Sequence, residues 1–183
     1  MPKLPRARTV LIPVALTVAV VACGSGRPVK NGLNRLEPVY DPDTGRLTLL
    51  KYDSKGTGNI DTWSYMDGAR VMRIELDTNG DGAVDRWEYY GADQRLERVE
   101  ISTKRDGKVE RIEYYEQGAL ARAEEDGNGD GKIDKWETYE GGRLSSVAFD
   151  TMRRGKPDRR LVYGADGFVR IELDFRGDAH SGK

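Results

Sequence analysis

Residues 77–101 read DTNGDGAVDRWEYYGADQRLERVEI, and this stretch decides the fold because variants of it recur along the chain. The position of Trp87 is filled in the other units by Trp63, Ile112, Trp136 and Arg160, at steps of 24, 25, 24 and 24 residues. A fixed period of this size is the signature of a repeat architecture. Five units cover residues 52–173, a half unit (39–53) precedes them, and the start of another (174–178) follows.

Alternating residue types predict two strands in each unit. Trp87 and Tyr89 share one face of the first strand, Val99 and Ile101 share a face of the second, and short Asp-Gly or Gly-Gly turns join such strands. The pattern predicts an all-β fold, an antiparallel meander of tandem ~24-residue β-hairpin repeats with about eleven strands in an open or curled single sheet. We expect one apolar and one charged face, with the apolar face covered by curling, pairing or coiling.

The strand-and-turn half of the repeat resembles the YD repeats of bacterial RHS-type proteins, most clearly in Tyr40-Asp41-Pro42-Asp43-Thr44-Gly45-Arg46-Leu47. The other units lose the Asp after the tyrosine or the Arg before the leucine. Five units are also too few for the large shells that those proteins build. The resemblance therefore implies hairpin geometry and nothing further.

The amino terminus has the pattern of a signal peptide. Residues 1–9 are basic, and residues 10–22 form an apolar run broken by Pro13. Thirteen residues rise only about 20 Å as a helix, short of the roughly 30 Å hydrocarbon core. Residues 1–22 are therefore predicted to be a cleaved signal peptide rather than a membrane span.

The end of that run, Val20-Val21-Ala22-Cys23, resembles the lipobox of bacterial lipoproteins. The resemblance implies cleavage before Cys23 and its acylation with palmitate-type chains, so that the protein crosses the inner membrane and becomes a lipid-anchored membrane protein. Gly24 takes the place of the Asp that retains such proteins at the inner membrane, which favours the outer membrane. We predict a flexible tether over 23–37, the repeat domain over 38–178 and a disordered tail over 179–183.

Two units open with loops that fit the calcium-loop pattern D-x-[DN]-x-[DN]-G. Oxygen atoms on alternate residues can turn towards one calcium ion, and glycine at position six permits the sharp reversal. The predicted calcium ligands are Asp77, Asn79, Asp81, Ala83 and Asp85 in one loop and Asp126, Asn128, Asp130, Lys132 and Asp134 in the other, with Ala83 and Lys132 contributing backbone carbonyls. Glu88 and Glu137 fall at position twelve of the loop pattern, and the sequence does not decide whether they are further ligands.

These loops resemble EF-hand loops over twelve residues, but twelve more residues per repeat leave no room for two helices. The better resemblance is to the Asp-rich loops of calcium-binding β-propellers and thrombospondin-type repeats. The alternative is that Asn, Asp and Gly serve only the geometry of a turn. The other three loops support this alternative, because Lys55, Thr57, Lys104, Met152 and Arg154 replace ligands there.

Composition excludes several classes of function. Without residues 1–22 the chain has 27 basic and 31 acidic residues, and the two kinds are interspersed along the sequence. This pattern lacks the basic patch that is typical of nucleic-acid binding. His180 is the only histidine and Cys23 the only cysteine, so we expect no enzyme and no catalytic residues. Two hypotheses remain: a tethered envelope module with calcium-stabilised loops in a structural or protein-interaction role, or a protein that binds a polysaccharide or protein partner through an exposed aromatic face.

Overall fold

The computed structural model describes residues 35–167 and 169–173, which form one antiparallel sheet of twelve strands. The signal peptide, Cys23 and the tail that the sequence predicts lie outside the described residues. The strands are β1 (Leu36–Tyr40), β2 (Leu47–Tyr52), β3 (Thr62–Asp67), β4 (Arg70–Leu76), β5 (Arg86–Tyr90), β6 (Leu96–Ile101), β7 (Arg111–Glu116), β8 (Ala119–Glu125), β9 (Lys135–Glu140), β10 (Arg143–Phe149), β11 (Arg159–Tyr163) and β12 (Val169–Leu173).

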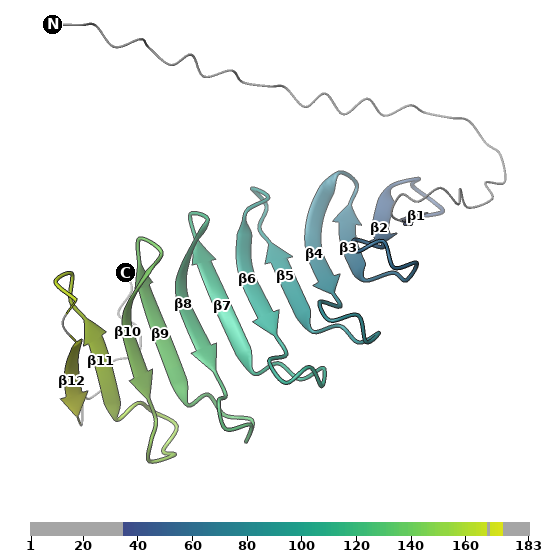
Figure 1. Ribbon diagram of the computed structural model, residues 1–183. Coiled ribbons are helices and arrows are strands. Elements are labelled where there is room, and N and C mark those ends of the chain that lie inside the picture. The colour runs from purple at the N-terminus through teal and green to yellow at the C-terminus, as the bar shows by residue number, and fades with distance from the viewer. Residues whose placement is uncertain (1–34, 168, 174–183) are drawn as a thin grey trace, which may run out of the picture. The chain divides into compact units, whose positions relative to one another are not determined.

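The order of the strands in the sheet is their order in the sequence, from β1 to β12, and the sheet does not close. The predicted all-β meander of hairpin repeats is therefore confirmed. The half unit forms a complete hairpin, because β1 begins at Leu36, inside the segment predicted as tether, and this brings the number of strands to twelve. Long loops lie at one end of the strands and tight hairpin turns lie at the other end (Figure 1).

The register of the hairpins contradicts the expectation of one apolar and one charged face. Trp87 of β5 lies opposite Glu100 of β6, whereas Val99 lies opposite Glu88. The tryptophans and the valines are therefore on opposite faces of the sheet, which we call the tryptophan face and the valine face. On each face an apolar residue on one strand alternates with a charged residue on the next.

A β-bulge beside the hairpin turn explains this register. The pairing of β5 with β6 shifts by one residue between Tyr89 and Tyr90, and similar shifts occur in β1–β2, β3–β4, β7–β8 and β9–β10. A one-residue shift moves every following side chain to the other face. Turn residues are visible in the sequence, but the extra bulged residue is not.

Arginine and glutamate cover the aromatic side chains on the tryptophan face. Trp87 lies between Glu75 and Glu100 of the neighbouring strands, and Tyr89 lies between Arg73 and Arg98. The guanidinium groups stack on tyrosine rings, with carbon-to-centroid distances of 4.3 Å for Arg73 on Tyr65, 4.2 Å for Arg98 on Tyr89 and 3.4 Å for Arg122 on Tyr114. These cation–π contacts cover apolar surface without a second layer.

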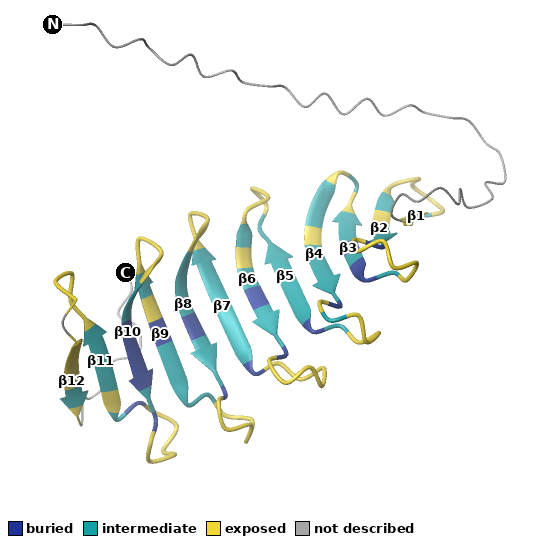
Figure 2. Ribbon diagram, in the orientation of Figure 1, coloured by how far each residue is buried: buried dark blue, intermediate teal, exposed yellow. Residues whose placement is uncertain are grey.

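The valine face is covered in the same way by the strands that lead into each hairpin. Val99 lies between Glu88 and Glu113 and is 0% exposed. Glu88 accepts hydrogen bonds from Arg86 Nε (2.8 Å) and from the Tyr90 hydroxyl (2.7 Å). Most sheet residues are thus half-buried, and the buried apolar residues are Val99 in β6, Ala123 in β8, and Val147 and Ala148 in β10 (Figure 2).

Candidate functional site

The candidate metal ligands lie in a series of loops at one end of the strands. Each loop leads from one hairpin to the next and has nine residues, numbered here as positions one to nine. The five loops are 53–61, 77–85, 102–110, 126–134 and 150–158. We call 77–85 and 126–134 the acidic loops, and 102–110 and 150–158 the basic loops.

Position one binds the backbone of its own loop. In the second acidic loop, Asp126 Oδ1 accepts the N–H of Gly129 (2.6 Å) and Asp126 Oδ2 accepts that of Gly131 (2.7 Å). In a basic loop, Asp150 accepts the N–H of Arg154 (2.9 Å) and of Gly155 (2.6 Å). Asp53, Asp77 and Ser102 accept equivalent bonds in the other three loops.

Position nine closes the loop from its other end. Asp134 Oδ1 accepts the N–H of Gly127 (3.0 Å) and Asp134 Oδ2 accepts that of Asn128 (3.2 Å). In a basic loop, Asp158 binds the hydroxyl of Thr151 and the N–H of Met152, each at 2.8 Å. Asp61, Asp85 and Glu110 act similarly in the other loops. Positions one and nine therefore hold one backbone frame in all five loops.

Positions four and six of the frame have left-handed backbone geometry. Gly129 and Gly131 have φ of +77° and +86° in the second acidic loop. In the basic loops position four is not glycine, yet Arg105 and Arg153 have φ of +60° and +56°. Side chains other than glycine rarely adopt this region, at a cost of about 1 kcal/mol. The frame therefore forms even where the local sequence opposes it.

The backbone donors favour the ionised carboxylates at position one. Burial works to raise the pKa of Asp126, but hydrogen bonds from Gly131 and Gly129 outweigh it and hold that pKa below its ordinary value. The pKa of Asp150 is lowered in the same way, against burial, by the N–H groups of Arg154 and Gly155. The acidic loop 126–134 and the basic loop 150–158 therefore both hold a negative charge at this position.

The acidic loops differ from the other loops in combining asparagine at position three with aspartate at position five. Aspartate alone also occupies position five in the basic loop 102–110, as Asp106. Asn79 Oδ1 accepts the N–H of Asp81 (2.8 Å), while Asp81 accepts the side-chain amide of Asn79 (2.8 Å) and the N–H of Ala83 (2.8 Å). The second acidic loop repeats the backbone contacts with Asn128 and Asp130. Position three is Lys55, Lys104 or Met152 in the other loops, so the frame does not need asparagine there.

Basic side chains from neighbouring loops flank both acidic loops. Lys55 Nζ of the first loop donates to the carbonyls of Asp77 (3.0 Å) and Thr78 (2.7 Å). Arg105 of a basic loop contributes to the lowered pKa of Asp81, after hydrogen bonds from Ala83 and Asn79.

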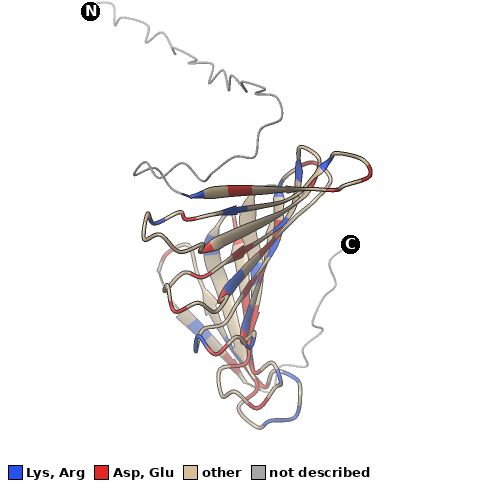
Figure 3. Ribbon diagram, turned by 90° about the vertical axis from the view of Figure 1, so that its right-hand side faces the viewer, with Lys and Arg blue, Asp and Glu red and all other residues tan. Residues whose placement is uncertain are grey.

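The second acidic loop has cations on both sides as well. Lys104 Nζ lies against the backbone of Gly129, and its charge helps to lower the pKa of Asp126. Arg153 of the following basic loop lines a small hollow with Asn128, Asp130 and Asp134. The negative charge of the acidic loops is therefore partly balanced within the protein, and Figure 3 shows both signs interspersed over the sheet and its loops.

The chemistry of the acidic loops suits a hard divalent cation. Asp77, Asn79, Asp81 and Asp85 offer carboxylate and amide oxygens, the ligands that calcium prefers. Among the described residues, however, no three His, Cys, Asp or Glu side chains lie together as a group that could hold a metal ion. The same side chains accept hydrogen bonds from the loop backbone, and each carboxylate oxygen has a second lone pair for a cation.

Glu88 and Glu137, the open position-twelve ligands, lie in the sheet rather than in the loops. Glu88 binds Arg86 and Tyr90, as described above. Glu137 Oε2 accepts hydrogen bonds from Arg111 Nη2 (2.7 Å) and the Tyr139 hydroxyl (2.9 Å). Glu137 Oε1 lies 2.8 Å from Lys135 Nζ.

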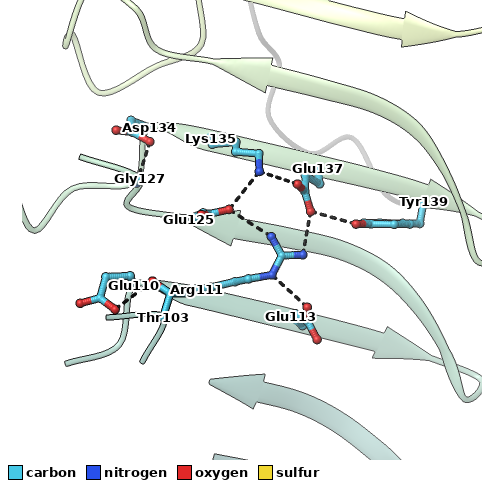
Figure 4. A network of polar contacts seen from close by, with 10 residues as sticks. All are labelled: Thr103, Glu110, Arg111, Glu113, Glu125, Gly127, Asp134, Lys135, Glu137 and Tyr139. Carbon is cyan, nitrogen blue, oxygen red and sulfur yellow. Dashed lines mark hydrogen bonds and ion pairs between the residues drawn. The ribbon is translucent and has the colours of Figure 1, made fainter. Parts of the chain in front are cut away.

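Arg111 is the centre of a charged network on the valine face (Figure 4). Its guanidinium reaches Glu113 (2.9 Å) on its own strand, Glu125 (3.1 Å) on β8 and Glu137 (2.7 Å) on β9. It can cross β8 because the residue there is Ala123, which is 1% exposed and has only a methyl side chain.

This network changes the protonation of its members. Burial works to raise the pKa of Glu137, but hydrogen bonds from Arg111, Lys135 and Tyr139 lower it to about 2. Burial alone would lower the pKa of Arg111, and its bonds to Glu137 and Glu113 raise it instead. The two cations and three carboxylates of the network thus join three adjacent strands. Sequence reasoning missed it, although the Arg-x-Glu pattern of residues 111–113 and Ala123 were visible signals.

Comparisons with known proteins add little to this description. No protein-family model matches the chain, and none of the curated proteins is similar enough to match it. A crystal structure of accessory secretory proteins 1, 2 and 3 of Streptococcus pneumoniae contains a similar chain, with a TM-score of 0.35, 17% identity, and coverage of 64% of this chain and 19% of that one. A GtfA/B complex bound to UDP and GlcNAc gives a TM-score of 0.25, 12% identity, and coverage of 76% and 24%.

This chain therefore spans only about a fifth to a quarter of those two chains, and likeness at this level carries no argument about function. In the described residues no helix is long and apolar enough to cross a membrane.

Proposed function

We propose that this protein is a lipid-anchored, non-catalytic module of the bacterial envelope, with a structural or protein-interaction role, and that calcium stabilises its two acidic loops. The lipobox-like Cys23 supports the anchor, and the exported location supplies calcium. The observation that carries the calcium proposal is the asparagine and aspartate at positions three and five. The frame forms with Lys104 or Met152 at position three, so the asparagine that accompanies the aspartate in the acidic loops is an addition to the frame.

The expected affinity is weak. Cations from neighbouring loops compete for the acidic loops, and Lys55 already binds the carbonyls of Asp77 and Thr78. With a dissociation constant of about 0.1 mM and about 1 mM free calcium, each loop would gain roughly 1.4 kcal/mol of stability. Calcium at these loops would act as a structural clamp rather than a signal sensor.

Thermal unfolding of residues 24–183, which contain all twelve strands, tests the calcium proposal. Calcium at 1 mM should raise the melting temperature relative to excess chelator, and Asp81→Ala with Asp130→Ala should abolish the difference. The matched control is Asp106→Ala in a basic loop, because Asp106 accepts the N–H of Lys108 (3.0 Å) as Asp81 accepts that of Ala83. An unchanged melting temperature for the parent chain would rule out the calcium clamp.

A second candidate function is recognition of a polysaccharide or protein by the tryptophan face. The specific observation is that Trp63, Trp87 and Trp136 occupy one row across the sheet, each opposite a glutamate on a neighbouring strand and half-buried. Trp63 and Trp87 are two strands apart, about 10 Å, and Trp87 and Trp136 are four strands apart, about 20 Å, so the three rings would stack on non-adjacent rings of a glycan. Under this alternative, glycans or cell-wall fragments quench tryptophan fluorescence and calcium leaves melting unchanged.

Membrane fractionation tests the anchor separately. The full-length chain, expressed in a bacterium with two membranes, should incorporate a labelled fatty acid and sediment with the outer membrane. Cys23→Ser should remove the label and release the protein from the membranes. A labelled Cys23→Ser chain would contradict the assignment of the lipid to this residue.

A further inference from the structure

The last described strand of the sheet, β12, repeats the sequence of part of β4, which is paired with a strand on each side. Arg170-Ile171-Glu172-Leu173 in β12 is identical to Arg73-Ile74-Glu75-Leu76 in β4, and the two segments have the same register in their hairpins. On its other side β4 is covered by β5. Within the described residues, no strand follows β12.

The missing neighbour exposes an apolar side chain that is covered in the inner repeats. Ile171 is 63% exposed, whereas the matching residues Val99, Ala123 and Val147 are 0%, 1% and 5% exposed. Val169 and Leu173 on the same face are 50% and 66% exposed. A row of three apolar side chains therefore lies along the edge of the sheet.

The backbone of β12 also faces outwards at these residues. In each preceding hairpin, the carbonyl of the last residue of the second strand accepts a hydrogen bond from the end of the following loop. The carbonyl of Leu76, for example, accepts the N–H of Asp85 (2.9 Å). Leu173 occupies this position in β12. Because alternate residues of a strand face the same neighbour, Val169, Ile171 and Leu173 direct their N–H and carbonyl groups to the open edge.

The opposite edge of the sheet is protected. Asp53 donates to the carbonyl of Arg35 (2.9 Å), so Arg35, Glu37 and Val39 face β2, and Pro38 faces outwards between them. Proline has no N–H, and it interrupts the hydrogen bonds that a further strand would need at β1. A head-to-tail array of β12 on β1 is therefore disfavoured.

We propose that β12 pairs with β12 of a second copy of this chain, which gives an antiparallel dimer centred on Ile171. In this register Ile171 faces its own copy, Val169 faces Leu173, and Arg170 faces Glu172 across the two-fold axis. The pairing makes about six backbone hydrogen bonds and two cross-strand ion pairs, and it continues the valine face from one copy to the other.

Charge fixes this register. A shift by two residues in one direction places Arg170 opposite Arg170, and a shift in the other direction places Glu172 opposite Glu172. Like charges directly opposite one another destabilise a sheet. Only the pairing centred on Ile171 matches opposite charges and keeps the three apolar side chains together.

Sedimentation of residues 24–183 over a range of concentrations tests the proposal. The parent chain should form a dimer, and Arg170→Glu or Glu172→Arg alone should raise its dissociation constant at least about ten-fold. An equimolar mixture of the two variants should dimerise again, because opposite charges then meet at both pairs. If the mixture stays monomeric while the parent dimerises, the proposed pairing is wrong.

A proline variant gives an independent test of the edge. Ile171→Pro removes an outward N–H, as Pro38 does at β1, and should give a monomer whose circular dichroism matches that of the parent. Persistent dimerisation of Ile171→Pro would assign the contact to another surface. A parent chain that dimerises only after residues 174–183 are deleted would show that its own carboxyl-terminal segment covers the edge, and this would overturn the proposal.

Discussion

The acidic loop 126–134 and the basic loop 150–158 have the same hydrogen-bonded frame and opposite charge. Asp126 and Asp150 bind the loop backbone at position one, and Asp134 and Asp158 bind it at position nine. Between these residues the first loop contains Asp130 and Lys132, and the second contains Arg153, Arg154 and Lys156. The comparison shows that the backbone of the loop and its charge are set by different positions.

The largest effect is expected from loss of the frame in either class of loop. Asp126→Ala and Asp150→Ala each remove a buried carboxylate that accepts at least two backbone N–H groups of its loop. Each change should lower the melting temperature by roughly 5–10 °C, and by similar amounts, because the frame is the same. Thermal unfolding without calcium measures this. A large effect in only one class would show that the loops do not share a frame.

Acid should weaken both classes of loop. The pKa values of Asp126 and Asp150 are lowered in the folded protein, so their contribution to stability is complete above the ordinary value of 3.8 and declines as the pH falls below it. Glu137, with its pKa lowered from 4.5 to about 2, adds to the loss over this range. Melting temperatures measured between pH 7 and pH 2 should therefore stay constant above about pH 4.5 and decrease at lower pH.

Serine at position one provides a matched control for the acid titration. Ser102 accepts the N–H groups of Asp106 and Gly107, each at 3.2 Å, with a hydroxyl that does not titrate in acid. Asp126→Ser should therefore keep the loop folded and make the melting temperature less dependent on pH. An unchanged pH profile would show that Asp126 does not cause the acid sensitivity.

A smaller effect is expected from the charge between the loops. Lys104→Ala removes the cation beside Gly129 and Asp126, so calcium should bind the second acidic loop several-fold more tightly. Calorimetric titration of the variant and the parent measures the change. Lys156→Ala, in the basic loop and without a described contact to an acidic loop, is the comparison variant, and an equal gain in both would contradict a local effect of Lys104.

The smallest effect concerns the backbone at position four. Arg105→Gly places glycine where φ is +60°, as at Gly80 and Gly129 in the acidic loops. Relief of the left-handed strain should stabilise the chain by about 0.5–1 kcal/mol, reduced by the lost attraction between Arg105 and Asp81. Chemical denaturation measures the difference. A destabilised variant would show that the charge of Arg105 matters more than its backbone conformation.

Much of the fold follows from the sequence, because period and alternation are local properties. The step from Trp63 to Trp87 predicted hairpins, and residues 77–85 were correctly placed in a loop. The faces were wrong because the bulge between Tyr89 and Tyr90 sets the register, and a bulge depends on backbone geometry that several residues can adopt. The sequence of a hairpin therefore does not reveal which residues of its two strands share a face of the sheet.

The candidate loops could be located from the sequence, but their electrostatic surroundings could not. Lys55 and Asp77 are 22 residues apart and come together only because neighbouring hairpins place their loops side by side. The same holds for Arg111 and Glu137, which meet across Ala123. Contacts one repeat away depend on side-chain reach over an intervening strand, and the linear pattern of residues does not encode this distance.

From loop 77–85 to loop 150–158, the alternation of acidic and basic loops gives the sheet an electrical period of two hairpins, twice its structural period. Deleting residues 102–125 would keep every strand paired in the same manner but would bring two negative loops together. Deleting residues 77–125 would preserve the order of charges. A sheet of this kind can therefore change its length without electrostatic conflict only by an even number of hairpins, even though each hairpin folds by the same rules.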